Sequence, residues 1–527
     1  MNAPVYEHTV IALRSIIHNE NEPLQNISHL LKYDPGLYFS LLKYINSSDK
    51  RNDITSISQA ITLIGAEGAE RFILQQQDAF LDERYHLLWC YAVLAGETAA
   101  LINERVDLAD EDEAFFAGLL PSIGMLLMLE ARSSYSKILE LLLKVPLEHR
   151  VFIEAGLYKS TLIAQLDRNL SAPKVYRDIA DLMAAVFSEE GRRRNHLEHP
   201  AKLSIAYKSF QLFRLLDAAD TAARALLFPA VVEAQEKFRE LCKRYFRIPE
   251  NEIEELMADV MERFEAVCQE LNVGELPERF FGSAESYVSP GITFLTKSES
   301  LKRVLDEAYA AAREDKNIFI YGESSVGKRL LSVALHRHAD NPRQTKPFLA
   351  IHCSTLDSET FEMELFGAKG GFLGFEKHKG ALELANGGII LLKDIDALPP
   401  MLQDRLADIL TNDEFYKIGE THPASFDIKF IVTSRVDIVR ETREGRFSER
   451  LLTAINPVSI PIPPLRERRE DIEFIADSII EKYNLNLTDK ALRLGLHEYY
   501  DAHAFPDNLR DLKRLLFFLS AKHSLKP

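Results

Sequence analysis

Hydrophobic residues in the first two hundred positions recur at helical spacing, and no segment of any length shows strand-like alternation. After Asp34-Pro35, the side chains of Leu37, Leu41, Leu42 and Ile45 fall on one helical face. Thr55 and Ser56 stand where an N-cap belongs, directly ahead of a further apolar series at helical spacing. The pattern predicts an all-α domain over residues 1–200.

Residues 201–295 continue as helices but are typical of a connector. Pro229 predicts a break, and an apolar stripe then runs from Ile253 to Leu271 at close to 3.6-residue spacing. The stripe is shorter than three heptads, so a helix packed on a neighbouring domain is favoured over a coiled-coil dimer. The glycines and prolines of residues 273–295 predict an irregular linker.

The pattern changes near residue 297. Short apolar runs at 317–321, 388–392 and 429–433 now alternate with helical segments. This alternation predicts an α/β domain with a mainly parallel sheet over residues 296–460. After Pro461 the chain returns to helices, which predicts a small helical subdomain over residues 461–527.

Composition narrows the choice of partners and compartment. The net charge of −17 argues against direct DNA binding, because phosphate neutralisation supplies most of the affinity of a duplex binder. No apolar run is long enough to span a bilayer and no leader precedes the first helix, so a cytoplasmic protein without membrane contact is expected. The four cysteines are far apart and form no metal-ligand pair.

A phosphate-binding loop directly follows the first of the predicted strands. Its residues are Gly322, Glu323, Ser324, Ser325, Val326, Gly327 and Lys328. Between a strand and a helix, such a loop closes its backbone N–H groups around phosphate oxygens while the lysine reaches the outer phosphates. Arg329 comes next, where a Ser or Thr usually touches Mg²⁺. ATP or ADP is therefore the candidate ligand, and Mg²⁺ is disfavoured.

Further motifs in the right order turn this loop into a family resemblance. They are residues 364–367, 380 with 383–385, 387–388, 464–472 and 505–512. The segment from residue 322 to residue 510 resembles the central AAA+ domain of bacterial enhancer-binding proteins, the activators of sigma-54 RNA polymerase. The resemblance implies a P-loop α/β subdomain with a helical lid, in which Arg510 senses the nucleotide.

One departure from the family removes its metal anchor. The family's acidic strand ends in Asp-Glu, and here Lys393 and Asp394 follow the apolar strand. A lysine where Mg²⁺ should be held has the wrong sign for metal-assisted phosphoryl transfer, although Lys393 could contact a phosphate itself. Asp394 could act as a degenerate acid only if the strand end bulges, since successive strand residues point to opposite faces. No metal ligand and no firm catalytic residue are predicted.

Two more departures concern partners. The family's two trans-acting arginines correspond to Ser448 and Ala454, and the nearby Arg446 and Arg450 are expected to be solvated. The surface loop that grips sigma-54 lacks its threonine and reads Gly371, Phe372, Leu373 and Gly374. The chain ends one or two helices after the lid arginine, so no DNA-binding helix-turn-helix is expected.

The first part of the chain resembles the HDOD family, a relative of the HD phosphohydrolases. The resemblance rests on residues 34–35, 41–47, 57–65, 88–89 and 114–124. The His-Asp pair of true HD hydrolases corresponds to Pro121-Ser122, neither of which can ligate a metal. His196 and His199, behind the arginines of residues 192–194, are expected in a solvated turn. The resemblance implies a helical platform for protein partners.

These expectations favour a bacterial signalling or transcription-regulating scaffold. Its HDOD half would bind a protein partner or signal, and its AAA+ half would be a nucleotide-sensitive or structural module without catalysis. Two alternatives stay open: an active ATPase in which Asp394 or Asp396 serves the metal, and a sigma-54 activator that works without DNA binding. A homo-oligomer also stays open, because the family habitually forms rings.

Overall fold

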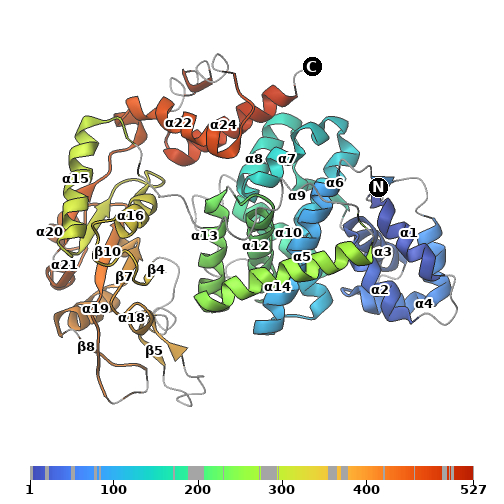
Figure 1. Cartoon of the computed structure of the whole chain (residues 1–527), viewed down its shortest axis with the longest axis horizontal. Coiled ribbons are helices and arrows are strands. Elements are labelled where there is room, and N and C mark those ends of the chain that lie inside the picture. Colours follow the sequence, from blue (N-terminus) through green and yellow to red (C-terminus); the bar gives the residue numbers. More distant parts are fainter. Residues whose placement is uncertain are drawn as a thin grey trace. The chain divides into compact units, whose positions relative to one another are not determined.

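In the computed structural model the chain forms two compact units (Figure 1). The helical unit comprises Met1–Val288, Lys482–Leu487 and Phe517–Pro527, and the α/β unit comprises Ser289–Glu481 and Thr488–Leu516. The structure describes residues 4–17, 23–48, 54–75, 80–81, 85–169, 173–187, 207–229, 231–271, 273, 294, 296–353, 362, 365–368, 378–412, 414–418, 420, 422–455, 457–488, 495–497, 499 and 504–525.

Helices α5 (His86–Val106) and α6 (Glu111–Ala131) form the centre of the helical unit, and α12 (Tyr207–Leu227) packs against both. Every residue of α5 from Leu88 to Asn103 is buried, so this helix is surrounded on all sides. The other helices are α1 (Glu7–Ile17), α2 (Leu24–Lys32), α3 (Pro35–Ser48), α4 (Ile57–Leu74), α7 (Leu139–Lys144), α8 (Leu147–Tyr158), α9 (Leu162–Asn169), α10 (Lys174–Phe187), α13 (Val232–Leu241) and α14 (Glu250–Glu270).

Local sequence signals in this unit are confirmed. The Ser56 hydroxyl accepts a hydrogen bond from the Gln59 backbone N–H and so caps α4. Helix α12 ends at Leu227, just before Pro229. The predicted stripe of α14 is buried against α5, with Phe264 in contact with Trp89 at 6.0 Å between ring centroids. The preference for a packed helix is therefore correct.

The unit is predominantly helical, as predicted, and the two-residue strands β1 (Val5–Tyr6) and β2 (Phe80–Leu81) add one parallel pair that is too short to show a readable alternation. One expectation for this unit was wrong. Helix α6 is long and apolar enough to cross a membrane, contrary to the expectation that no apolar run reaches that length. It is the one such helix among the described residues, and 89% of its apolar window is buried in the structure. A helix covered on every side needs no polar face.

The α/β unit contains the predicted parallel sheet, with strand order β11-β3-β10-β7-β4. Its strands are β3 (Ile318–Tyr321), β4 (Phe348–His352), β7 (Ile389–Lys393), β10 (Lys429–Ser434) and β11 (Val458–Pro461). The main helices are α15 (Glu299–Arg313), α16 (Lys328–Arg337), α19 (Pro400–Asn412), α21 (Glu449–Ile455), α22 (Glu470–Tyr483) and α24 (Leu509–Ser524), of which the ends of α22 from Lys482 and of α24 from Phe517 belong to the helical unit. Shorter elements are β5 (Gly367–Ala368), β6 (His378–Lys379), α18 (Ala381–Leu384), β8 (Glu414–Phe415), β9 (Ala424–Ser425) and α20 (Ile438–Arg443).

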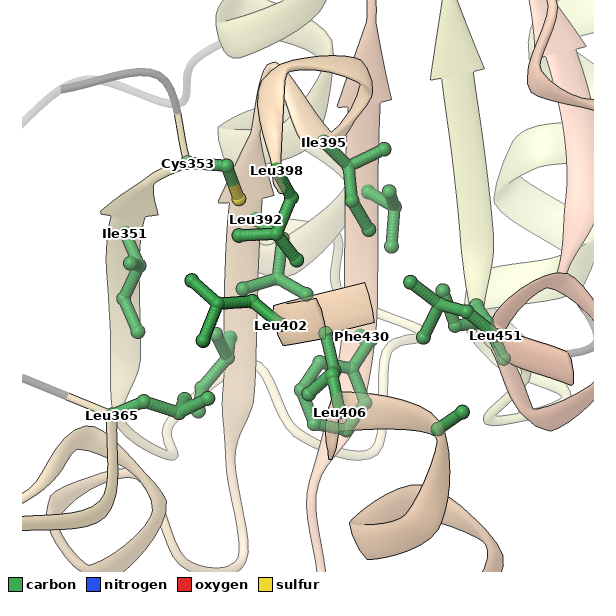
Figure 2. Packing of buried hydrophobic residues seen from close by; sticks show 14 of the residues in the cluster. Ile351, Cys353, Leu365, Leu392, Ile395, Leu398, Leu402, Leu406, Phe430 and Leu451 are labelled. Carbon is green, nitrogen blue, oxygen red and sulfur yellow. The ribbon is translucent and has the colours of Figure 1, made fainter. Parts of the chain in front are cut away.

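Alternate residues of each strand serve two separate cores. Ile389 and Leu391 of β7 pack with α15 and α16 on one face of the sheet. Leu392 packs on the opposite face with Leu402 and Leu406 of α19, as Figure 2 shows. Because side chains alternate between the two faces, the face on which each residue at the end of β7 lies follows from its position in the strand.

Candidate functional site

The loop between β3 and α16 has the backbone of a phosphate-binding loop. Gly322 and Gly327 have φ of 150° and 109°, conformations that side chains rarely adopt. A Cβ on Gly322 would lie 2.4 Å from the Ile462 carbonyl oxygen, and one on Gly327 would lie 2.9 Å from the Phe294 ring. Both glycines are thus required by close approach as well as by φ.

Lys328 points back into this loop. Its Nζ donates to the carbonyl oxygens of Gly322 at 2.6 Å and Glu323 at 2.9 Å. Burial lowers the pKa of Lys328, while Asp394 and Asp396 both act to raise it. The ammonium group is therefore held by neutral carbonyls and sits within the field of two carboxylates.

Residues of the two segments that flank the helical lid, one after β11 and one before α24, form hydrogen bonds with the phosphate loop. Arg466 forms two hydrogen bonds with the Glu323 carboxylate, at 2.8 and 2.5 Å. The Asn508 side chain donates to the Ser324 carbonyl at 3.0 Å, and Arg468 donates to the Val326 carbonyl at 2.8 Å. Because these groups follow β11 or precede α24, a displacement of the phosphate loop would also displace the start of the lid.

These lid residues were missed as site residues by reasoning from the sequence. Arg466, Arg468 and Asn508 lie inside the two motifs, 464–472 and 505–512, that carry the family resemblance. Taking each polar residue of those motifs as a candidate partner of the phosphate loop would have found them.

The end of β7 carries the substituted acidic pair. Lys393 is buried, with 8% of its surface exposed. Asp394 follows in a left-handed conformation with φ 53°, and its backbone N–H donates to the Thr433 hydroxyl at 3.3 Å. The strand therefore ends in the kind of bend that Asp394 would need in order to approach the phosphate loop.

The residues present do not fit the Mg²⁺ site of the family. A buried lysine occupies the metal-anchoring position, and the half-buried Arg329 occupies the position of the Ser or Thr ligand. Throughout the described ranges, no group of three or more His, Cys, Asp or Glu side chains is arranged to hold a metal ion. Two cations stand where two oxygen ligands would be needed.

The positions of the trans-acting arginines are occupied by groups with structural contacts. The Ser448 hydroxyl donates to Asp404 at 3.1 Å. Arg446 is paired with Glu441 and Glu444, and Arg450 is paired with Asp408. Both arginines are well exposed, as expected of solvated surface charges.

The remaining predicted residues fall in three places. Arg510 lies in the first turn of α24, half-buried. Pro121 and Ser122, at the positions of the HD pair, are both buried within α6. The partner loop 371–374 and the basic segment with His196 and His199 lie outside the described residues.

Family models match both parts of the chain. The model for the HDOD domain matches residues 3–152, and the model for the Sigma-54 interaction domain matches residues 294–461.

Curated relatives match the α/β part. The Nif-specific regulatory protein of Azotobacter vinelandii is 33% identical over 225 residues, which are 41% of this chain and 42% of that protein. The DNA-binding transcriptional regulator NtrC of Salmonella typhimurium is 34% identical over 213 residues, 40% of this chain and 45% of that protein. The chain therefore spans less than half the length of these relatives.

Among solved structures, NtrX from Brucella abortus in complex with ADP aligns with a TM-score of 0.39 and 24% identity. That alignment covers 51% of this chain and 59% of NtrX.

Proposed function

We propose that this chain, which joins an HDOD domain to a Sigma-54 interaction domain, is a regulatory protein whose AAA+ module binds ATP or ADP without sustained hydrolysis. The nucleotide phosphates would be held by Gly322–Lys328 with Arg329, and Arg510 of the lid would sense them. The module would then work as a nucleotide-sensitive interaction surface, and not as a motor.

One observation carries this proposal: an intact phosphate loop is combined with a buried lysine at the metal-anchoring position. Lys328 and the two glycines at positive φ have the backbone geometry of a loop that binds phosphates. Lys393 removes the anion that would hold the metal. Binding depends on the first feature and hydrolysis on the second, so the two are expected to separate.

The missing arginines act in the same direction. An arginine finger stabilises transition-state charge and is worth about three to five orders of magnitude in rate. Ser448 and Ala454 cannot supply that charge. Arg446 and Arg450 are each paired with carboxylates of this chain, which favours a surface role for them.

Protein partners are proposed for both units. The helical unit would act as a binding platform for protein partners, since Pro121 and Ser122, at the positions of the HD pair, are buried and cannot ligate a metal. For the α/β unit, the family description makes the sigma-54 polymerase the first partner to test. The acidic net charge of −17 favours such protein contacts over direct DNA binding, in a cytoplasmic protein. Assembly into a homo-oligomer is a further possibility, which activity measurements over a range of protein concentrations would test.

A second candidate function is ATP hydrolysis with a rewired site. The observation that favours it is that Asp394 and Asp396 both act electrostatically on Lys328 and raise its pKa. In this alternative, the double variant Asp394→Asn with Asp396→Asn would abolish phosphate release while leaving the fold intact.

The proposed function is tested by equilibrium titration of a fluorescent ADP or ATP analogue into the purified chain. Lys328→Ala should weaken binding at least about tenfold, because it removes about 1.4 kcal/mol or more of phosphate contact. Lys302→Ala is the matched control, since Lys302 is exposed on α15 and pairs with the neighbouring Glu299. Absence of binding by the unaltered chain would refute the proposal and leave a purely structural module.

A further inference from the structure

We infer that Lys393 replaces the divalent cation, so that this site binds nucleoside di- or triphosphates independently of Mg²⁺. This inference rests on the proposed nucleotide binding and specifies the chemistry of the same site. It is carried by three observations: the direction of Lys393, the charge that it supplies, and the burial of its side chain.

Strand alternation sets the direction of Lys393. Ile389 and Leu391 face the core shared with α15 and α16, whereas Leu392 faces the opposite core. Lys393 continues the row of Ile389 and Leu391 at the carboxyl end of β7. That row leads toward the face of the sheet where α16 begins at Lys328, the first residue after the phosphate loop.

The register of the sheet brings the end of β7 level with the phosphate loop. Val432 of β10 pairs with Leu392 of β7, and Ser434 of β10 pairs with Tyr321, the last residue of β3. Since β10 lies between β3 and β7, the ends of all three strands form one edge. Ligands of open parallel sheets bind at the carboxyl ends of the strands.

Charge arithmetic shows why a lysine suits this position. In a metal-dependent site, one Mg²⁺ with one anchoring aspartate presents a net charge of about +1 to the phosphates. Lys393 presents the same net charge by itself and needs no metal ligand. With Arg329 in place of the second metal ligand, the site supplies two cations that are covalently part of the chain.

Burial makes this charge effective. With 8% of its surface exposed, the Lys393 side chain has lost most of its water, and charges interact more strongly at lower effective dielectric constant. Asp394 and Asp396 also act electrostatically on Lys328, where they raise its pKa against the lowering effect of burial.

The test compares nucleotide titrations in excess Mg²⁺ and in EDTA. The unaltered chain should bind a fluorescent ADP or ATP analogue with dissociation constants that agree within about threefold, a free-energy difference below 1 kcal/mol. Lys393→Asp, which restores the family residue, should lose at least about tenfold in affinity in EDTA and regain part of it with Mg²⁺. Lys393→Met should weaken binding equally in both buffers, and circular dichroism would confirm that each variant is folded.

Three outcomes are distinguishable. Equal binding in both buffers with the expected behaviour of Lys393→Asp supports the inference. Binding by the unaltered chain that requires Mg²⁺ overturns the inference and leaves the proposed function standing; its loss on replacing Asp394 and Asp396 by asparagine would assign the metal to them. No binding in either buffer overturns both.

Discussion

Glu154 shows what a single buried carboxyl does in the helical unit. Tyr135 donates a hydrogen bond to one of its oxygens at 2.5 Å, and the Leu162 backbone N–H donates to the other at 2.7 Å. Burial raises the pKa of Glu154 to about 7, against the opposing effects of these hydrogen bonds and of Arg150. Glu154 is therefore largely neutral in the folded protein at mildly acidic pH.

The pH dependence of stability follows from this raised pKa. Between about pH 4.5 and 7 the folded state binds more protons at Glu154 than the unfolded state does, so its contribution falls as pH rises through that window. From pH 5 to pH 8, the stability advantage of the unaltered chain over Glu154→Gln should decrease by about 1–3 kcal/mol. Urea unfolding can be followed through Trp89, the only tryptophan and a fully buried one.

Glu140→Gln is the control for this measurement. Glu140 is exposed and pairs with Lys144 one helical turn away, so its replacement should change stability little and equally at both pH values. If the curve of Glu154→Gln ran parallel to that of the unaltered chain between pH 5 and pH 8, the raised pKa would be wrong.

The sequence was sufficient to identify which residues of the site are altered, but not to predict their conformations and contacts. Lys393, Ser448 and Ala454 are visible as departures because the motifs around them fix the alignment. The left-handed backbone conformation of Asp394 cannot be predicted from the sequence. It depends on the angle at which β7 joins the short helical turn Ile395–Ala397. Hydrogen bonds between distant residues, such as Glu323 with Arg466, also depend on tertiary structure.

At the level of elements, the phosphate loop and the start of α24 form one supported structure. Asn508 is fully buried, accepts from the Leu465 backbone N–H at 2.6 Å and donates to the Ser324 carbonyl. The Leu509 backbone N–H donates to the Ser325 carbonyl at 3.1 Å. Loop and lid are therefore expected to open together.

Asn508→Ala should loosen this structure. The change leaves the buried Leu465 N–H without its acceptor, at a cost of about 1–3 kcal/mol. Hydrogen exchange followed by mass spectrometry should then show about 10- to 100-fold faster exchange in peptides that cover the phosphate loop and residues 465–468. The control is Lys302→Ala, an exposed position on α15, which should leave these peptides unchanged. Acceleration confined to α24 would contradict the coupling.

For the whole molecule, hydrophobic periodicity predicted the class of both units. Long amphipathic helices and short apolar strands are strong signals, and the strands at 317–321, 388–392 and 429–433 were confirmed within a residue or so. The strands β1 and β2 were not predicted, because two residues are too few to show a period. The apolar length of α6 was also missed, because periodicity does not reveal the neighbouring helices that bury it on every side. The order of strands in the sheet also required the structure.

The central claim is that nucleotide binding has been separated from hydrolysis in this chain. Steady-state release of phosphate from Mg²⁺-ATP tests it most directly, over protein concentrations high enough to permit assembly, with Lys328→Ala as the control. The account predicts no turnover above that control. Clear turnover that Lys328→Ala abolishes would contradict it and show that the α/β unit is a working ATPase despite Lys393 and the missing arginines.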